Sequence, residues 1–323
     1  MKLYTSVDIA ASERKIGYGD KILLLGSCFA DNVGAKFAEH YFQTTVNPLG
    51  TLYNPASIAQ AITDTRYPIS DTRFLHHNGL WHSMMHHGSF SCADQQELVR
   101  RCEESRLALQ SAVAEATTVI ITFGTAWVYQ MDGEVVANCH KLPANRFVRR
   151  RLTVDEIVDM WQPIVASMPD KHWIFTVSPI RHAKDGLHEN QISKAILLQA
   201  VDILTAQRSN SPMGGLTSDS AQRGLSYFPS YEIMMDELRD YRFYAEDMVH
   251  PSAVAGDYIW QRFVETYMAA DTQSEMRMLH QLWRDRQHRF LHPDSEEALR
   301  FNQYLSARLK DLQQRYPWLD RTL

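Results

Sequence analysis

The sequence predicts an α/β fold in which helices cover both faces of a parallel sheet. Continuously apolar runs, typical of strands buried on both faces, occur at residues 22–25, 118–123 and 173–177. Segments with apolar residues at helical spacing separate these runs, and such alternation favours a parallel sheet. With 323 residues the chain is slightly long for a single core. We therefore expect an α/β domain over 1–268, with insertions around 72–92 and 127–150, and a C-terminal helical extension over 269–323.

The individual elements follow from local signals along the chain. Asn78-Gly79 and Asp132-Gly133 are dipeptides that favour tight β-hairpin turns, so each insertion is expected to contain a hairpin. Thr153 and Glu156 have the spacing of a capping box and mark a helix start. In chain order we expect strands at 22–25, 41–46, 118–123, 173–177 and near 227–235, and helices at about 28–40, from 55, and at 94–116, 153–168, 189–206, 252–280 and 294–314.

The composition excludes several classes of function. Thirty-three basic and 38 acidic residues give a net charge of −5, which argues against a dedicated nucleic-acid surface. The arginines at 146 and 149–151 are expected to be solvated residues that lead into a helix.

The amino-terminal residues lack an apolar run of secretory length, and the strand-like runs are too short to span a membrane. The four cysteines, at 28, 92, 102 and 139, contain no C-x-x-C pair, so neither a disulfide framework nor a thiolate zinc site is indicated. We expect a cytoplasmic protein without a metal or other cofactor, and the sequence leaves its oligomeric state open, a homo-oligomer included.

The stretch around Ser27 is the first candidate for chemistry. Four apolar residues end at Gly26-Ser27, and residues at helical spacing follow at once. Ser27 is therefore expected at the carboxyl end of a strand and the positive end of a helix dipole, where ligands of α/β sheets collect. A serine there is a candidate nucleophile. It is equally a favoured helix N-cap, and the sequence alone leaves both roles open.

The second candidate lies more than two hundred residues downstream, at Asp247 and His250. Pro251 disfavours a helical conformation at His250, so both side chains are expected in the loop before a helix that starts near Ser252. An aspartate in such a loop can accept the Nδ1 proton of the histidine, which leaves Nε2 free to take a proton from a hydroxyl. A serine needs such a base, because its hydroxyl is a weak nucleophile.

Together these residues resemble a known family. The run Gly26-Ser27-Cys28-Phe29-Ala30 is similar to the signature of the GSCFA family, a branch of the SGNH (GDSL-like) hydrolase superfamily. The similarity covers roughly residues 20–265 and includes further blocks at 47–55, 123–127, 138–141, 175–179 and 236–244.

The resemblance implies a three-layer, flavodoxin-like α/β/α sandwich and a serine enzyme that hydrolyses or transfers acyl groups. Ser27 would be the nucleophile, His250 the base and Asp247 the residue that orients it. The substrate would be a small acyl ester, with an acetyl group and a carbohydrate alcohol among the candidates. The same machinery with an alcohol in place of water would make an acyltransferase.

The resemblance also implies an oxyanion hole. Backbone N–H groups at Gly50 and at Ser27 or Cys28 would be donors. The third block of SGNH enzymes offers an asparagine, and here Ala126 stands in its place. Three side chains are candidates to replace it: Thr125, Asn138 and His140. Without a replacement the chain would be a ligand-binding protein on the same fold.

The sequence also contains reactive cysteine and histidine side chains outside this set. Cys28 sits at a helix start, which can activate a thiol, but we expect it to pack against the sheet. Cys139 and His140 are expected to line the pocket rather than to react. The histidines at 77, 82, 86 and 87 are numerous, but residues alternate in direction along a hairpin, so a metallohydrolase built on them is disfavoured.

Overall fold

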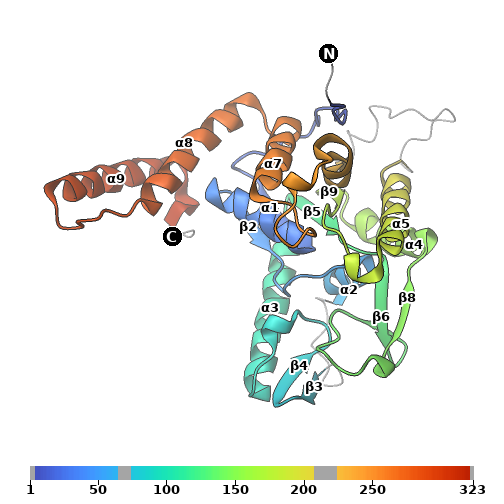
Figure 1. The fold of residues 1–323 in the computed structure, drawn as a ribbon. Helices are drawn as coiled ribbons and strands as arrows, with labels where there is room; N and C mark the ends of the chain where they lie inside the picture. Colours follow the sequence, from blue (N-terminus) through green and yellow to red (C-terminus); the bar gives the residue numbers. More distant parts are fainter. Residues whose placement is uncertain (1–3, 65–73, 207–223, 321–323) are drawn as a thin grey trace.

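A five-stranded parallel sheet forms the centre of the computed structural model, which describes residues 4–64, 74–206 and 224–320 (Figure 1). The strands lie in the order β10-β9-β5-β1-β2, and each neighbouring pair is parallel. Counted along the chain this is the 2-1-3-4-5 order of flavodoxin-like sheets, so the predicted fold class is confirmed. The strand bounds are β1 Lys21–Gly26, β2 Gln43–Val46, β5 Thr118–Phe123, β9 His172–Val177 and β10 Leu225–Phe228.

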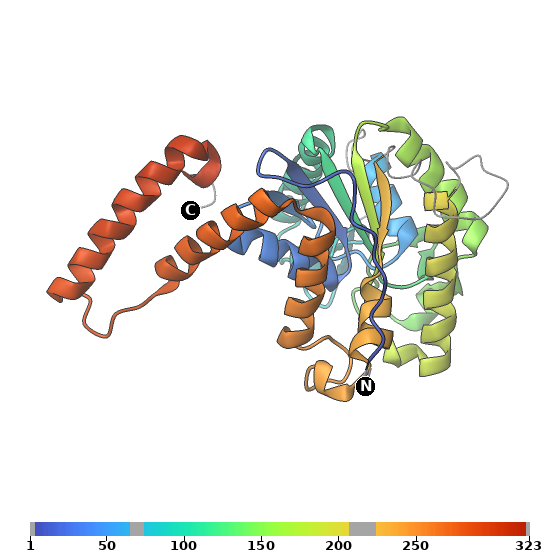
Figure 2. The same cartoon turned by 90° about the horizontal axis from the view of Figure 1, so that it is seen from above.

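Helices cover both faces of this sheet (Figure 2). Successive side chains of a strand point to opposite faces, so Leu23 and Leu25 of β1 join one core cluster while Ile22 and Leu24 join the other. Helices α2, α3, α4 and α5 pack on the first cluster, and α1 and α7 pack on the second. Their bounds are α1 Cys28–Glu39, α2 Pro55–Asp64, α3 Gln95–Glu115, α4 Val154–Ser167, α5 Leu187–Ala206 and α7 Ala253–Tyr267.

Both insertions contain the predicted hairpins. The turns at Asn78-Gly79 and Asp132-Gly133 have positive φ at both residues, as tight hairpin turns require. The strands are β3 Phe74–His77 and β4 Leu80–Ser83 in the first insertion, and β6 Trp127–Met131, β7 Glu134–Val136 and β8 Val148–Arg151 in the second. The two insertions share a small apolar cluster, and we call residues 74–92 and 127–151 together the hairpin region.

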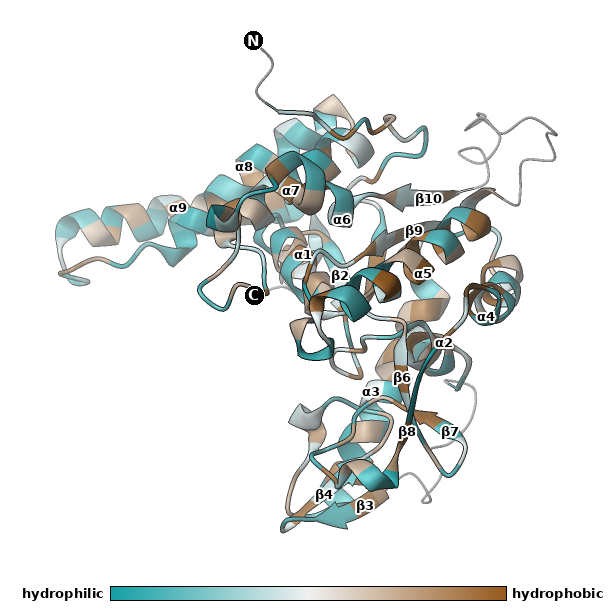
Figure 3. Cartoon of the chain, turned by 45° about the vertical axis from the view of Figure 1, so that its right-hand side comes forward, coloured by the Kyte–Doolittle hydropathy of each residue, from teal (hydrophilic) through white to brown (hydrophobic). Residues whose placement is uncertain are grey.

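The carboxyl-terminal helices α8 (Ala270–Gln287) and α9 (Glu296–Arg315) project from the sandwich (Figures 1 and 2). The helix predicted at 252–280 is divided, because α7 ends at Tyr267 and α8 begins at Ala270. Met276 and Leu279 of α8 are buried in the same cluster as α1, whereas α9 is hydrophilic along much of its length (Figure 3). Over the described ranges, no helix combines the length and apolar character that a membrane span needs.

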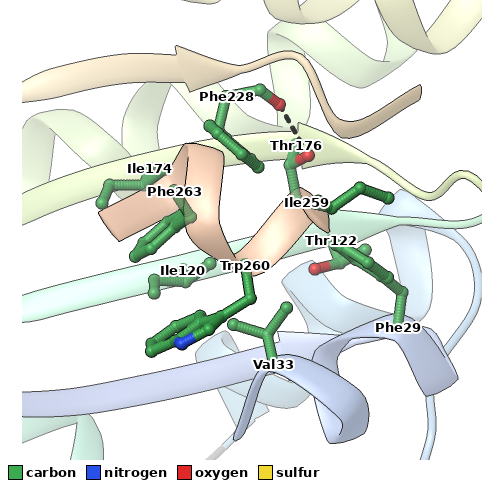
Figure 4. A pocket seen from close by; sticks show the side chains of 10 residues that line it. All are labelled: Phe29, Val33, Ile120, Thr122, Ile174, Thr176, Phe228, Ile259, Trp260 and Phe263. Carbon is green, nitrogen blue, oxygen red and sulfur yellow. Dashed lines mark hydrogen bonds between the residues drawn. The ribbon is translucent and has the colours of Figure 1, made fainter. Parts of the chain in front are cut away.

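A small void lies between α1, α7 and the sheet (Figure 4). Its volume of about 10 Å³ is at the lower limit for a single water molecule. Phe29, Ile120 and Trp260 are among its mainly apolar walls, so it is a packing defect rather than a place for a substrate. A substrate site is expected instead at the carboxyl ends of the strands.

Candidate active site

The turn between β1 and α1 fixes the two residues that follow it. Gly26 has φ +142°, and a Cβ on it would lie 2.2 Å from the carbonyl oxygen of Thr122, so only glycine fits. This close approach lets the N–H of Ser27 donate to that oxygen at 3.2 Å. The Ser27 hydroxyl accepts a hydrogen bond from the N–H of Phe29 at 3.3 Å, and the residue is 1% exposed. Ser27 thus has the N-cap role that the sequence left open.

The side chain that meets His250 belongs to Cys28. Its Sγ lies 3.7 Å from Nε2 of His250, and Nδ1 of His250 donates to Oδ2 of Asp247 at 2.6 Å. Oδ1 of Asp247 accepts the N–H groups of Val249 and His250, both at 2.9 Å. These hydrogen bonds, first that from the N–H of His250, lower the pKa of Asp247 to about 2. Because Asp247 accepts the hydrogen bond from Nδ1–H, Nε2 is left to accept the thiol proton.

The expectation that Ser27 faces His250 is therefore corrected. Among the described residues, the hydroxyl of Ser27 makes no hydrogen bond to His250 and serves the helix backbone. Each helical residue is rotated by about 100° from the one before it, so the first residue of α1, Cys28, points where Ser27 does not. Cys28 does pack against the apolar cluster beside α1, as predicted, but its sulfur also reaches the imidazole. Burial, and next Asp31, raise the pKa of Cys28, and the N–H groups at the helix start and Lys194 act in the opposite direction.

A buried lysine supports the ends of two strands at this site. Lys194 of α5 is 1% exposed, and its Nζ donates to the carbonyl oxygens of Gly124 and Ser178, both at 2.7 Å. Gly124 follows β5 and Ser178 follows β9, so one ammonium group joins the loops that leave these strands. Burial lowers the pKa of Lys194 to about 7, and the neighbouring Cys28 opposes this shift.

His182, in the loop after β9, brings a second imidazole to the same place. A Cβ built on Gly124 would lie 3.4 Å from Nε2 of His182 and 3.3 Å from Cβ of Ser27, so the ring lies beside the β1–α1 turn. Nε2 is buried and has no hydrogen-bond partner among the residues that the structure describes. Burial, and to a lesser extent Lys194 and His250, lower the pKa of His182 to about 4 against the opposing effect of the Gly124 backbone, so the ring is neutral near pH 7.

Two of the predicted oxyanion donors are engaged elsewhere. The N–H of Gly50 donates to the carbonyl oxygen of Asn47 at 2.7 Å, and a Cβ on Gly50 would meet His87 at 2.3 Å. The N–H of Thr125 donates to the carbonyl oxygen of Tyr53 at 3.0 Å. The Thr125 hydroxyl accepts the N–H of Trp127 and lies 3.1 Å from the Ser193 hydroxyl. The assignment of Gly50 is corrected, because a turn hydrogen bond consumes its N–H donor. The Thr125 hydroxyl contacts Ser193 and Trp127, and its assignment stays a prediction. The N–H of Cys28 stays a prediction.

The predicted pocket residues Asn138, Cys139 and His140 lie in the hairpin region. Nε2 of His140 donates to the carbonyl oxygen of Ser83 at 2.7 Å, and its N–H donates to Oδ1 of Asn138 at 2.9 Å. Burial lowers the pKa of His140 and raises that of Cys139. Within the described ranges, none of the three contacts Cys28 or His250. In the same ranges, no three His, Cys, Asp or Glu side chains are grouped as metal ligands.

Two supporting residues were not singled out from the sequence. Oδ1 of Asn47 accepts the N–H of Gly26 at 2.8 Å, and Nδ2 donates to Asp31 at 2.7 Å, which fixes the β1–α1 turn from the end of β2. Asn47 opens the 47–55 block, whose role was assigned to Gly50 alone. Lys194 had its own signal: it occupies the buried face of α5 at helical spacing with Asn190, Leu197 and Val201.

Comparison with known proteins bears on the family. The model of the GSCFA family matches residues 21–263, which include the β1–α1 turn, the loop after β9, and the Asp247–His250 segment. No match was found among curated proteins or among solved structures. A family model that covers most of the chain, with the site inside its bounds, establishes that this chain belongs to the GSCFA family.

Proposed function

We propose that this protein hydrolyses or transfers acyl groups, with Cys28 as the nucleophile, His250 as the base and Asp247 as the residue that orients the base. The observation that carries the proposal is the line of contacts from Sγ through the imidazole to the carboxylate, at 3.7 and 2.6 Å. A nucleophile, a base within reach of its proton and a third group that orients the base are the parts that covalent acyl transfer needs. The flavodoxin-like sheet, with its nucleophile after the first strand, also supports placing the family in the SGNH superfamily.

In the proposed reaction, the thiol proton of Cys28 passes to Nε2 of His250 as the sulfur attacks the carbonyl carbon of an ester. The carbonyl π electrons move to the oxygen and form a tetrahedral oxyanion. Its collapse breaks the ester C–O bond, and the alcohol leaves with the proton from His250. Water, deprotonated by His250, then cleaves the thioester and releases the acid and the thiol. An alcohol in place of water gives acyl transfer. Asp247 stays ionised throughout, since its pKa is about 2.

His182 is the proposed replacement for the missing asparagine of the third block. Its Nε2 is buried beside Gly124 without a hydrogen-bond partner in the described part of the chain, and in the Nε2–H tautomer it is a donor that awaits an acceptor. The pKa of His182 is lowered to about 4, so the ring donates as a neutral group, as an asparagine amide would. The N–H of Cys28 at the start of α1 is the second proposed donor, favoured by the helix dipole.

A binding protein without catalysis is the second candidate. It is favoured by the raised pKa of Cys28, which disfavours the thiolate, and by the engagement of Gly50 and Thr125 in other hydrogen bonds. On this alternative the site would hold an ester without cleaving it. A serine esterase built on Ser27 would need the hydroxyl to leave its N-cap bond to Phe29.

The experiment is acylation by 4-nitrophenyl acetate, followed by peptide mass spectrometry. We expect an acetyl group on Cys28 and turnover that is lost in Cys28→Ala. Ser27→Ala should remain acylated, and Cys139→Ala is the matched control because burial also raises the pKa of that thiol. An acetyl group on Ser27 would restore the serine mechanism. Absence of acylation and of turnover would favour the binding protein.

A further inference from the structure

A pocket of about 470 Å³ lies at the same edge of the sheet as Cys28 and His250. Its walls come from the loop after β9, from α5 and from the segment after β10. The volume is in the range of pockets for small molecules. One wall, Ile233–Leu238, is a π-helical turn, a rare conformation that is common at functional sites.

Of the two arginines and two aspartates that line the pocket, one arginine makes no ion pair among the residues that the structure describes. Arg239 pairs with Asp236 at 3.9 Å, and Asp240 pairs with Arg242 at 3.8 Å, so both aspartates of the pocket have a basic partner. Arg181 makes no ion pair within the described residues. Its Nη1 donates to the carbonyl oxygen of Met248 at 3.2 Å, which leaves the Nε–Nη2 edge open. That edge matches the two oxygens of a carboxylate.

Aromatic rings surround this guanidinium group. Arg181 lies 5.2 Å from the ring centre of Tyr244 and 5.9 Å from that of Tyr241. Tyr231 forms a further wall, and its hydroxyl donates to Gln191 at 2.7 Å. Burial raises the pKa of Tyr231 and of Tyr244, so both rings stay neutral. Neutral aromatic walls around a cation suit a flat ring that carries a negative charge.

The pocket and the candidate active site share a loop. Arg181 enters the pocket and His182, the next residue, lies beside the β1–α1 turn, so the two sites are one residue apart on the chain. The N–H of Arg181 also donates to the carbonyl oxygen of Val249 at 3.1 Å, next to His250. Tyr244 forms a β-bridge with Pro251 on the other side of that histidine. A molecule in the pocket therefore borders the residues proposed for chemistry.

We infer that this pocket binds the alcohol part of the ester as a ring that carries a carboxylate. The carboxylate would bind the Nε–Nη2 edge of Arg181, and the ring would pack against Tyr231 and Tyr244. The inference rests on the proposed function, since it names the substrate class of the same site. The pocket itself can nevertheless be tested without turnover.

The kinetic test compares 4-acetoxybenzoate with its neutral methyl ester, which differ in the carboxylate charge. In the unmodified protein the anionic substrate should have the higher kcat/KM. Arg181→Gln should lower the ratio of the two kcat/KM values about tenfold or more, whereas Arg300→Gln, an exposed arginine of α9 away from the pocket, should leave it unchanged. An equal loss for both substrates would overturn the inference, because Arg181 would then only hold the His250 loop in place.

The binding test measures 4-hydroxybenzoate by calorimetry, with Arg181→Gln, Arg300→Gln and Cys28→Ala. We expect the dissociation constant to rise about tenfold or more in Arg181→Gln alone. Such binding without any turnover would sustain the pocket and reject the proposed function. Turnover without an effect of Arg181 in either test would reject the pocket and sustain the function. Binding of phenyl phosphate, but not of 4-hydroxybenzoate, would overturn the assignment of a carboxylate.

Discussion

The histidines of the hairpin region and those at the strand ends differ in what their ring nitrogens contact. In the hairpin region, His82 bonds the Ser91 hydroxyl at 2.7 Å and the carbonyl oxygen of His77 at 3.1 Å. His86 bonds the hydroxyls of Ser83 and Ser105, at 2.7 and 3.1 Å. Both nitrogens of each ring are thus used inside the fold.

At the carboxyl ends of the strands, the Nε2 atoms of His182 and His250 lack such hydrogen bonds within the described ranges. Nε2 of His182 has no partner in the described part of the chain, and Nε2 of His250 faces only the thiol of Cys28. A buried polar atom without a partner costs about 1–3 kcal/mol, so a fold retains one where another role compensates. A histidine cluster in a sequence therefore indicates structure or chemistry only after its hydrogen bonds are known.

Outside Cys28, His250 and Asp247, replacing His182 should have the largest effect. His182→Leu removes the proposed oxyanion donor, and we expect kcat to fall about 100- to 1000-fold, the usual loss for one such donor. The free energy of unfolding should stay the same or rise, because a buried polar atom without a partner is removed. His182→Asn keeps an N–H donor and should recover part of the rate. Ester turnover and urea unfolding measure the two quantities, and an unchanged kcat in His182→Leu would remove the residue from the mechanism.

The sequence predicted the elements whose signals are local. Apolar runs located the strands, Asn78-Gly79 and Asp132-Gly133 located the hairpin turns, and the spacing of Asp247 and His250 predicted their contact. These features depend on neighbouring residues and on backbone preferences, which a single sequence contains.

The sequence did not determine which side chain faces His250. A shift of one residue in the start of α1 exchanges Ser27 and Cys28, and that start depends on the fit of Gly26 against β5. Strand β8 was missed for a related reason. Its arginines suggested solvated chain, but Arg149 lies 4.1 Å from the ring centre of Trp127, a contact across strands that no local pattern shows.

The pH dependence of stability tests whether a buried ring nitrogen without a partner is by itself a sign of a functional site. His172 at the start of β9 also has a buried Nδ1 without a partner among the described residues, yet it lies at the opposite edge of the sheet. Burial lowers the pKa of His172 and of His182 from 6.5 to about 4. Between these values the unfolded chain binds more protons than the folded chain, so stability is lost as the pH falls from 6.5 to 4.

The expected slope is at most about 1.4 kcal/mol per pH unit for each of these histidines. Urea unfolding of His172→Phe between pH 6.5 and 4 should show a slope smaller than that of the unmodified protein by up to this amount, with turnover at pH 7 unchanged. A slope that stays the same would mean that His172 is protonated in the folded state. A loss of turnover would place a functional role at the amino ends of the strands.

His86→Leu should lower the stability and leave kcat unchanged, which is the opposite of the result expected for His182→Leu. It leaves the hydroxyls of Ser83 and Ser105 without their imidazole partner in a buried place, at a cost of about 1–3 kcal/mol. The folded protein should keep its kcat, because His86 lies in the hairpin region. Urea unfolding and turnover at a temperature well below the transition check both statements. A lower kcat with unchanged stability would give the hairpin region a part in the chemistry.

The smallest effect is expected at Ser27. Ser27→Ala removes the N-cap of α1 and should cost about 1 kcal/mol of stability. Because the cap fixes the start of α1 rather than reacting, acylation of Cys28 should continue in Ser27→Ala. If stability is unchanged while acylation stops, the Ser27 hydroxyl is the nucleophile. A side chain whose hydrogen bond is used inside the fold would then carry the chemistry, and hydrogen bonding would not distinguish structural from catalytic residues at this site.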